Sequence, residues 1–81
     1  HILDYMEVDA SHAIFEVEVP AEWIGKTVGG LDIRKRYNIN ILAVKKEGEF
    51  TISISPDTYF AENNKLLVLG EYRDLQKCFR I

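Results

Sequence analysis

The chain has few of the residues that build metal centres or disulfide frameworks. Its 81 residues include one cysteine, Cys78, and two histidines, His1 and His12. A single cysteine cannot form an intramolecular disulfide, which fits a reducing cytoplasm, and it has no cysteine partner for a metal ion. The histidines lack the close spacing of metal-binding pairs, which favours exposed and uncommitted side chains. The sequence therefore predicts neither a metal site nor a cofactor.

Long apolar runs and net positive charge are also absent. No apolar stretch approaches the roughly 20 residues of a membrane-spanning helix, and residues 1–10 lack the basic flank and apolar centre of a signal peptide. Ten lysines and arginines against thirteen aspartates and glutamates give a net charge of −3. Nucleic acids and anionic lipids usually require a basic surface. We therefore expect no nucleic-acid partner, and a bound anion must be held locally.

No group of side chains has the pattern of a catalytic centre. Ser53, Ser55 and Asp57 are close in sequence, but strand alternation predicts that both serines lie on a solvated face. No histidine is near enough in sequence to act as their base. The glycines of the central region lack the spacing of a phosphate-binding loop. The sequence therefore does not predict an enzyme.

What is present fits one small α+β domain. Hydrophobic residues make up 47% of the chain and charged residues 28%, which is typical of a globular domain. A chain this short buries only about 60% of the surface that its unfolded form exposes, so self-association would add apolar burial. A homodimer is therefore the expected state.

Hydrophobic periodicity and turn residues predict the order β-α-β-β-β-α. Thr27 is a suitable N-cap for a helix ending near Tyr37, where Asn38 can adopt the left-handed conformation that stops a helix. Two glycines inside this helix, Gly29 and Gly30, suggest close approach by another backbone. The other predicted elements are a strand at 13–19, a hairpin of 39–44 and 50–55, a strand at 65–69 and a helix at 74–81. We expect a mixed or antiparallel sheet with its helices on one side.

A basic segment marks the end of the central helix. Arg34, Lys35 and Arg36 are followed by Asn38 and Asn40. A guanidinium can bind a phosphate through two hydrogen bonds, and an asparagine can both donate to and accept from a base or ribose edge. The alternative is that these cations only complement the dipole at the helix C-terminus. The segment is the best candidate for ligand sensing in a domain without other recognisable chemistry.

At these residues the sequence resembles the TrkA C-terminal domain, also called the RCK C-terminal lobe, of regulators that gate bacterial potassium transporters and channels. The opening residues look like the crossover that follows a nucleotide-binding lobe in the potassium-uptake regulators of Gram-positive bacteria. We therefore divide the chain into a linker, 1–12, and a ligand-sensing domain, 13–81. Asn38 and Asn63-Asn64 stand where the family often has Gly and Gly-Asp. The matching runs are Ile24–Val28, Leu31–Tyr37, Ile41–Val44, Pro56–Thr58 and Lys65–Gly70.

The resemblance implies a homodimeric regulatory lobe that binds cyclic di-AMP at its dimer interface and inhibits potassium uptake. Its partners would be the cyclic dinucleotide, a second copy and a membrane potassium-translocating subunit, reached through an N-terminal lobe outside this chain. The location would be cytoplasmic, at the inner face of the membrane. The alternative function is a structural dimerisation lobe that binds no small molecule.

The resemblance also implies individual roles. Arg34 would hold a phosphate, Asn40 and Asp32 would bond adenine or ribose edges, and apolar walls would come from Val28, Ile41 and Pro56. Each role has a structural alternative. The walls could be ordinary core, Asp32 could pair with Arg36 four residues later, and the proline could merely end a strand.

Overall fold

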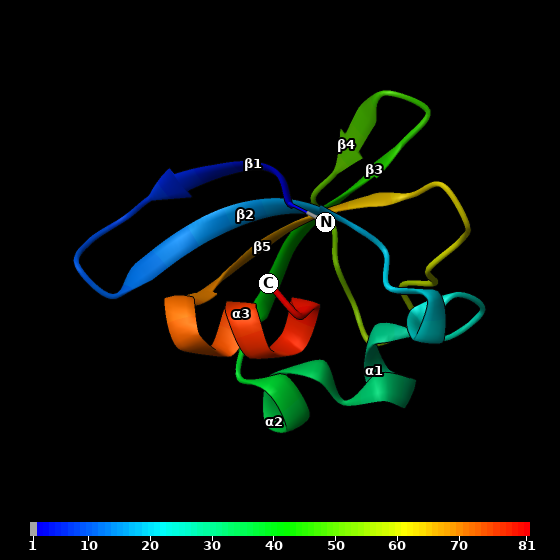
Figure 1. Cartoon of the computed structure of the whole chain (residues 1–81). Helices are drawn as coiled ribbons and strands as arrows, with labels where there is room; N and C mark the ends of the chain where they lie inside the picture. Colours follow the sequence, from blue (N-terminus) through cyan, green and yellow to red (C-terminus); the bar gives the residue numbers. More distant parts are fainter. Residues whose placement is uncertain (1) are drawn as a thin grey trace.

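The computed structural model describes residues 2–81, which form a five-stranded sheet with its helices on one face (Figure 1). The strand order is β1-β2-β5-β3-β4, and every neighbouring pair is antiparallel. The predicted mixed or antiparallel sheet is therefore antiparallel, and the one-sided placement of the helices is confirmed. The strands are β1 (Ile2–Glu7), β2 (His12–Glu18), β3 (Asn40–Lys46), β4 (Glu49–Thr51) and β5 (Lys65–Glu71).

The helices are short. The strands predicted at 13–19 and 65–69 and the helix predicted at 74–81 are present, with their ends shifted by at most two residues. Across residues 2–81, no helix combines the length and the apolar character that crossing a membrane requires. The helical elements are η1 (Ala21–Trp23), α1 (Val28–Leu31), α2 (Ile33–Tyr37) and α3 (Tyr72–Phe79).

The prediction of one continuous helix between Thr27 and Tyr37 is wrong, because Asp32 interrupts it. Asp32 has φ 52° and ψ 50°, which is left-handed backbone. Its neighbours Leu31 and Ile33 are 5% and 2% exposed. In a continuous helix, residues two apart point about 200° away from each other, so they could not both face one core. The left-handed residue changes the direction of the chain and lets both side chains be buried.

The predicted second strand of the hairpin is also too long. Glu47 and Gly48 both have positive φ, which forms a tight hairpin turn, but β4 ends at Thr51. The following residues cross to α1, where the Gly29 amide donates to the Pro56 carbonyl at 2.8 Å. Residues 52–55 do not pair with β3, and Ile52 is 78% exposed. The serines of this segment are therefore not on the strand face that alternation predicted.

Residues 2–7 form a strand that the sequence analysis did not predict. This strand, β1, pairs with β2 along its length, for example through Met6 opposite Ile14. All of its side chains are exposed, so the strand leaves no burial pattern in the sequence. Apolar residues lie on both of its faces, and Tyr5 and Met6 are each 61% exposed. The assignment of 1–12 as a link to a preceding lobe stays a prediction.

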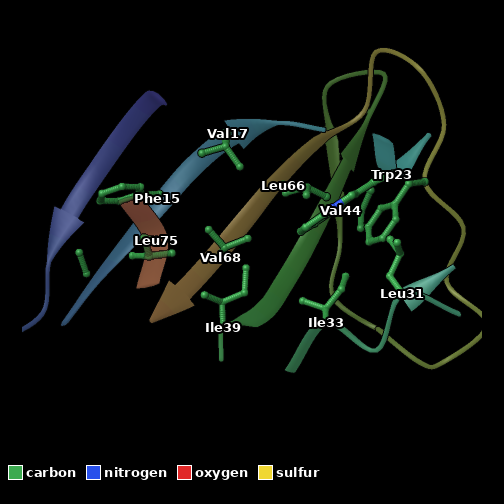
Figure 2. Packing of buried hydrophobic residues seen from close by; sticks show 12 residues of the cluster. Phe15, Val17, Trp23, Leu31, Ile33, Ile39, Val44, Leu66, Val68 and Leu75 are labelled. Carbon is green, nitrogen blue, oxygen red and sulfur yellow. The ribbon is translucent and has the colours of Figure 1, made fainter. Parts of the chain in front are cut away.

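The core lies between the sheet and α3 (Figure 2). Alternate residues of β2 and β5 point into it, including Phe15 and Val68, and Leu75 of α3 is fully buried against them. Burial of each such side chain contributes about 1.5–3 kcal/mol. At the end near η1, the Trp23 ring lies 5.5–5.7 Å from three aromatic rings, so the core continues beneath both α2 and α3. These rings belong to Tyr37, Phe60 and Phe79.

Candidate functional site

The turn between α2 and β3 brings Arg34 and Asn40 together. Arg34 lies in α2 and Asn40 begins β3, with Asn38 between them at φ 56° and ψ 40°. The predicted helix stop is therefore confirmed. Reversal of the chain at this residue places the Arg34 Nη2 atom 2.6 Å from the Asn40 Oδ1 atom, to which it donates a hydrogen bond.

These two residues open onto a cleft of about 190 Å³. Four of the six residues predicted for the site line it together, and they are Val28, Arg34, Asn40 and Ile41. Three further isoleucines, at 33, 39 and 54, complete the walls. Ile33 was not predicted, because a continuous helix was expected from Thr27 to Tyr37. Ile54 was not predicted, because the second strand of the hairpin was expected to extend to residue 55.

Pro56 and Asp32, the other two predicted site residues, lie beside the cleft and do not line it. Pro56 packs on α1, where a Cβ atom added to Gly29 would lie 2.9 Å from both the carbonyl oxygen and the Cβ of Pro56. This close approach of a backbone confirms the reason suggested for Gly29, whereas a Cβ atom added to Gly30 would meet only the Thr27 side-chain oxygen, at 3.0 Å. Asp32 is exposed at the junction of α1 and α2 and accepts a backbone hydrogen bond from the Arg36 amide. Among residues 2–81, the side chains of Asp32 and Arg36 form no ion pair.

The cleft combines one cation with apolar walls. Within the part of the chain that the structure describes, Arg34 has no carboxylate partner. Its hydrogen bond to Asn40 uses one of five guanidinium N–H donors and leaves the rest for another acceptor. The side-chain oxygen of Asn40 already accepts the hydrogen bond from Arg34, so the side-chain N–H groups of Asn40 remain to bind a ligand. This arrangement suits an anionic group attached to a flat, weakly polar body.

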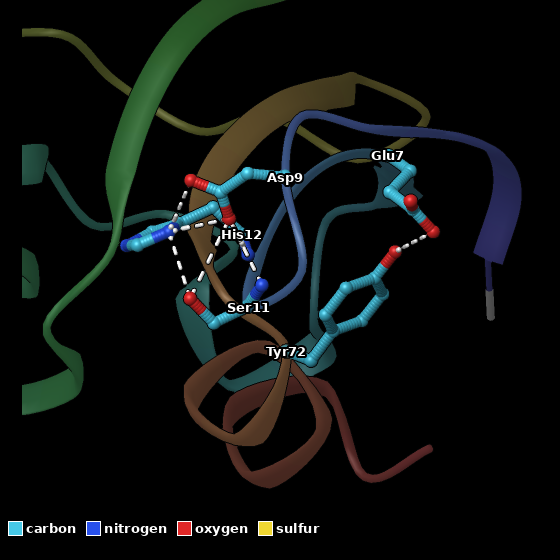
Figure 3. Close-up of polar contacts among 5 residues, drawn as sticks. All are labelled: Glu7, Asp9, Ser11, His12 and Tyr72. Carbon is cyan, nitrogen blue, oxygen red and sulfur yellow. Dashed lines mark hydrogen bonds and ion pairs between the residues drawn. The ribbon is translucent and has the colours of Figure 1, made fainter.

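A second polar cluster, at the β1–β2 hairpin, is a structural element (Figure 3). The Asp9 carboxylate accepts hydrogen bonds from the backbone amides of Ser11 and His12, and its Oδ1 lies 2.9 Å from the His12 Nδ1. The expectation that His12 is uncommitted is therefore wrong, whereas His1 lies outside the described residues. Donation from Ser11, and then from His12, lowers the pKa of Asp9 to about 2.

The neighbouring pair in Figure 3 joins this hairpin to α3. The Tyr72 hydroxyl donates to Glu7 at 3.4 Å, and the Tyr72 backbone amide donates to the Ser11 carbonyl at 2.9 Å. Burial, followed by the charge of Glu7, raises the pKa of the Tyr72 phenol. Between residues 2 and 81, no three His, Cys, Asp or Glu side chains are grouped as a metal site would require. The hydrogen bonds from Tyr72 to Glu7 and Ser11 fix the hairpin against α3.

Comparison with known proteins gives consistent results. A family model described as the TrkA-C domain matches residues 12–81. Ktr system potassium uptake protein C of Bacillus subtilis (strain 168) is 31% identical over 77 residues, which cover 95% of this chain and 35% of that protein. The K(+)/H(+) antiporter subunit KhtT of the same organism is 36% identical over 64 residues, which cover 78% of this chain and 39% of that protein.

A solved structure of the RCK C domain of the potassium transport protein KtrA, in complex with cyclic diadenosine monophosphate, has the same fold. It superposes with a TM-score of 0.79 at 33% identity, over 85% of this chain and 81% of that chain. The match covers 81% of that solved domain. In contrast, the chain spans only 35% and 39% of the length of the two curated relatives.

Proposed function

The chain belongs to the TrkA-C domain family, and from that membership we propose that it is the ligand-sensing domain of a potassium-transport regulator that binds cyclic di-AMP between two copies. The family is regulatory and non-enzymatic, as the sequence analysis predicted. The observation that carries the proposal is the cleft in which Arg34, free of any carboxylate partner in residues 2–81, meets Asn40 above isoleucine walls. Similarity to a domain solved with this ligand supports the choice of ligand.

The chemistry of the cleft matches half of a cyclic dinucleotide. The Arg34 guanidinium would bind one phosphate, and the Asn40 amide would bond an adenine or ribose edge. Val28 and Ile41 would cover the faces of the base. Asp32 and Pro56 lie just outside the cleft of a single chain, where they would contact the remainder of the ligand.

The size of the cleft favours a site shared by two chains. Ligand pockets typically have about 300–1,000 Å³, whereas this cleft has about 190 Å³. A cyclic dinucleotide has two phosphates and two-fold symmetry. One guanidinium from each protomer would then bind one phosphate across an isologous interface. The second copy would complete the site.

Binding between two chains provides a mechanism for regulation. A ligand that contacts both protomers favours the one relative orientation in which both clefts are engaged, which is a population shift. The segment 1–12 would transmit that orientation to a preceding lobe, and through it to a membrane potassium-translocating subunit. The regulator would work at the cytoplasmic face of the membrane, where it would inhibit uptake.

Isothermal titration calorimetry with cyclic di-AMP tests the proposal. Arg34→Ala should weaken binding roughly 10- to 100-fold, because a charge-assisted hydrogen bond is lost. The matched control is Lys35→Ala, which makes the same charge change on an adjacent exposed residue that does not line the cleft. It should bind with nearly wild-type affinity. Equal affinity of the Arg34→Ala and wild-type proteins would reject the assigned site.

The second candidate function is a dimerisation lobe that binds no small molecule. The exposed apolar side chains on both faces of β1 favour it, since such a strand can pair with a second copy. This function predicts a dimer whose melting temperature is the same with and without cyclic di-AMP. If the domain binds cyclic di-AMP, the melting temperature should instead rise as the concentration of cyclic di-AMP increases.

A further inference from the structure

A second cavity lies on the other side of α2, against α3. The two helices are neighbours beneath the sheet (Figure 1). The cavity has about 330 Å³ and shares no lining residue with the Arg34 cleft. Its volume falls within the usual range for small-molecule sites, about 300–1,000 Å³. Its lining residues are Arg36, Tyr37, Asn38, Asp74, Lys77 and Cys78.

Two cations at this cavity have no carboxylate partner. Arg36 comes from α2 and Lys77 from α3, and neither forms an ion pair with any carboxylate in residues 2–81. Asp74 is the one acidic lining residue, so the lining carries two positive charges and one negative charge, a net +1. The two helices thus converge cations on a cavity although the chain as a whole carries −3. An anionic group is the ligand chemistry that this lining favours.

The walls of the cavity are held in place by the core. The Arg36 Cζ atom lies 5.2 Å from the centroid of the Tyr37 ring, and stacking of this kind leaves guanidinium N–H groups free. The Tyr37 ring packs on buried Trp23 at 5.6 Å. Cys78 supplies a neutral side, because burial, with a smaller effect of Glu22, raises its pKa to about 12. The cavity therefore combines an aromatic ring and a neutral thiol with cationic groups.

Asp74 shows which anions the cavity would select. Its Oδ2 atom accepts a hydrogen bond from the Asn38 Nδ2 atom at 3.1 Å, which joins the end of α2 to the first turn of α3. A carboxylate repels a bare anion but accepts hydrogen bonds from hydroxyl groups. A ligand that satisfies both the cations and Asp74 therefore carries an anionic group and hydroxyl groups on one small molecule, as a phosphorylated sugar does.

We propose that the α2–α3 cavity binds a phosphorylated ribose, as found in a mononucleotide. Arg36 and Lys77 bind the phosphate, and the Asp74 carboxylate accepts a hydrogen bond from a ribose hydroxyl. This site is separate from the proposed cyclic di-AMP site, and the inference does not depend on that function. A ligand bound here would connect α2 to α3, and α2 also carries Arg34. The site is therefore placed to affect the cleft on the other side of α2.

An NMR titration of the ¹⁵N-labelled 81-residue chain with AMP tests the inference. Amide signals of Asn38, Asp74 and Lys77 should shift in a saturable manner. Arg36→Ala and Lys77→Ala should each weaken AMP binding roughly 10- to 100-fold, as expected for loss of a charge-assisted hydrogen bond. Both residues are exposed, so the variants should fold, and the unchanged dispersion of their spectra checks this. Lys35→Ala is the matched control and should leave the affinity for AMP unchanged.

The Asp74→Asn variant and two smaller ligands, inorganic phosphate and ribose 5-phosphate, identify which part of AMP is recognised. Asp74→Asn should bind inorganic phosphate more tightly than the wild type does, because a negative charge is removed from the cavity. It should also lose part of the wild-type preference for AMP over phosphate. Ribose 5-phosphate should bind the wild type more tightly than inorganic phosphate does. Equal affinities for the two would show that the cavity binds only a bare anion and would reject the ribose assignment.

The two proposals can fail separately. Arg34→Ala should weaken the binding of cyclic di-AMP roughly 10- to 100-fold and leave that of AMP intact, whereas Arg36→Ala should weaken only the binding of AMP, by a similar factor. The further inference is overturned if AMP shifts signals around Arg34 and Asn40 only, if millimolar AMP gives no saturable shift, or if Arg36→Ala binds AMP like wild type. None of these results would affect calorimetry with cyclic di-AMP.

Discussion

The centre of the sheet and the margin around α1 are stabilised in different ways. At the centre, alternate residues of β2 and β5 and Leu75 of α3 are buried together without polar groups. At the margin, the position of α1 depends on single local features, such as the close approach of Gly29 to Pro56 and the left-handed backbone of Asp32. The centre provides stability, whereas the margin provides the shape of the cleft. Substitutions should therefore change stability most at the centre and ligand affinity most at the margin.

The largest effect is expected from Leu75→Ala. The Leu75 side chain is fully buried, so its truncation removes apolar contacts and leaves a cavity, at a cost of about 2–5 kcal/mol in the free energy of unfolding. Urea denaturation followed by circular dichroism measures this. Gln76→Ala, at the adjacent exposed position, is the control and should change stability by less than about 0.5 kcal/mol. Similar losses for the two variants would show that α3 is not part of the core.

Gly29→Ala should be the next most damaging and should affect the cleft as well. The new methyl group would lie 2.9 Å from the Pro56 carbonyl oxygen, which is backbone and cannot rotate away. Overpacking of this kind lowers the free energy of unfolding by about 1–3 kcal/mol. It should also displace the segment 52–58, which connects β4 to the contact with α1, and so weaken cyclic di-AMP binding.

Gly30→Ala is the matched control for that change. There the nearest atom to the added Cβ is the Thr27 side-chain oxygen, at 3.0 Å, and alanine also favours helix. The urea denaturation midpoints of the two variants compare their stabilities, and that of Gly29→Ala should be the lower. If Gly30→Ala proved as destabilising as Gly29→Ala, close approach of the Pro56 backbone would not be the reason for glycine at position 29.

Thr27→Ala should have a smaller effect, again at the margin. The Thr27 hydroxyl accepts a hydrogen bond from the Gly30 amide at 3.0 Å and caps α1. Loss of such a cap typically costs about 1 kcal/mol. Thermal unfolding should show a lower melting temperature for Thr27→Ala and a nearly unchanged one for Thr27→Ser, which keeps the hydroxyl. A serine variant as unstable as the alanine variant would implicate the threonine methyl group instead.

The smallest effect is expected at the hairpin of Asp9, outside both regions. Its pKa is lowered from 3.8 to about 2 in the folded chain, so its carboxylate stabilises the fold fully above pH 3.8. That stabilisation is lost as the pH falls from 3.8 towards 2. The difference in melting temperature between wild type and Asp9→Asn should therefore shrink over this range. A difference that stays constant from pH 5 to pH 2 would contradict the hydrogen bonds assigned to this carboxylate.

The sequence predicted the parts of the fold that have a burial pattern. Alternation of apolar residues predicted β2, and hydrophobic periodicity predicted α3 to within two residues at each end. β1 was missed because its side chains are exposed, and β4 was predicted too long because the 52–55 alternation is typical of a strand. The predicted site residues Val28, Arg34, Asn40 and Ile41 came from a family resemblance, and the structure brings these four to one cleft. Their roles in binding stay predictions.

Local chemistry in the sequence determined where elements begin and end, through the Thr27 cap, the Asn38 stop and the Glu47-Gly48 turn. These signals act over a few residues, so they can be recognised one at a time. Only the tertiary structure decided that Asp32 breaks the helix, that 52–55 leaves the sheet, and that Arg36 and Lys77 meet at one cavity. Each of these depends on contacts between residues far apart in the chain. Such contacts form only when the whole core is packed, and they override local preference.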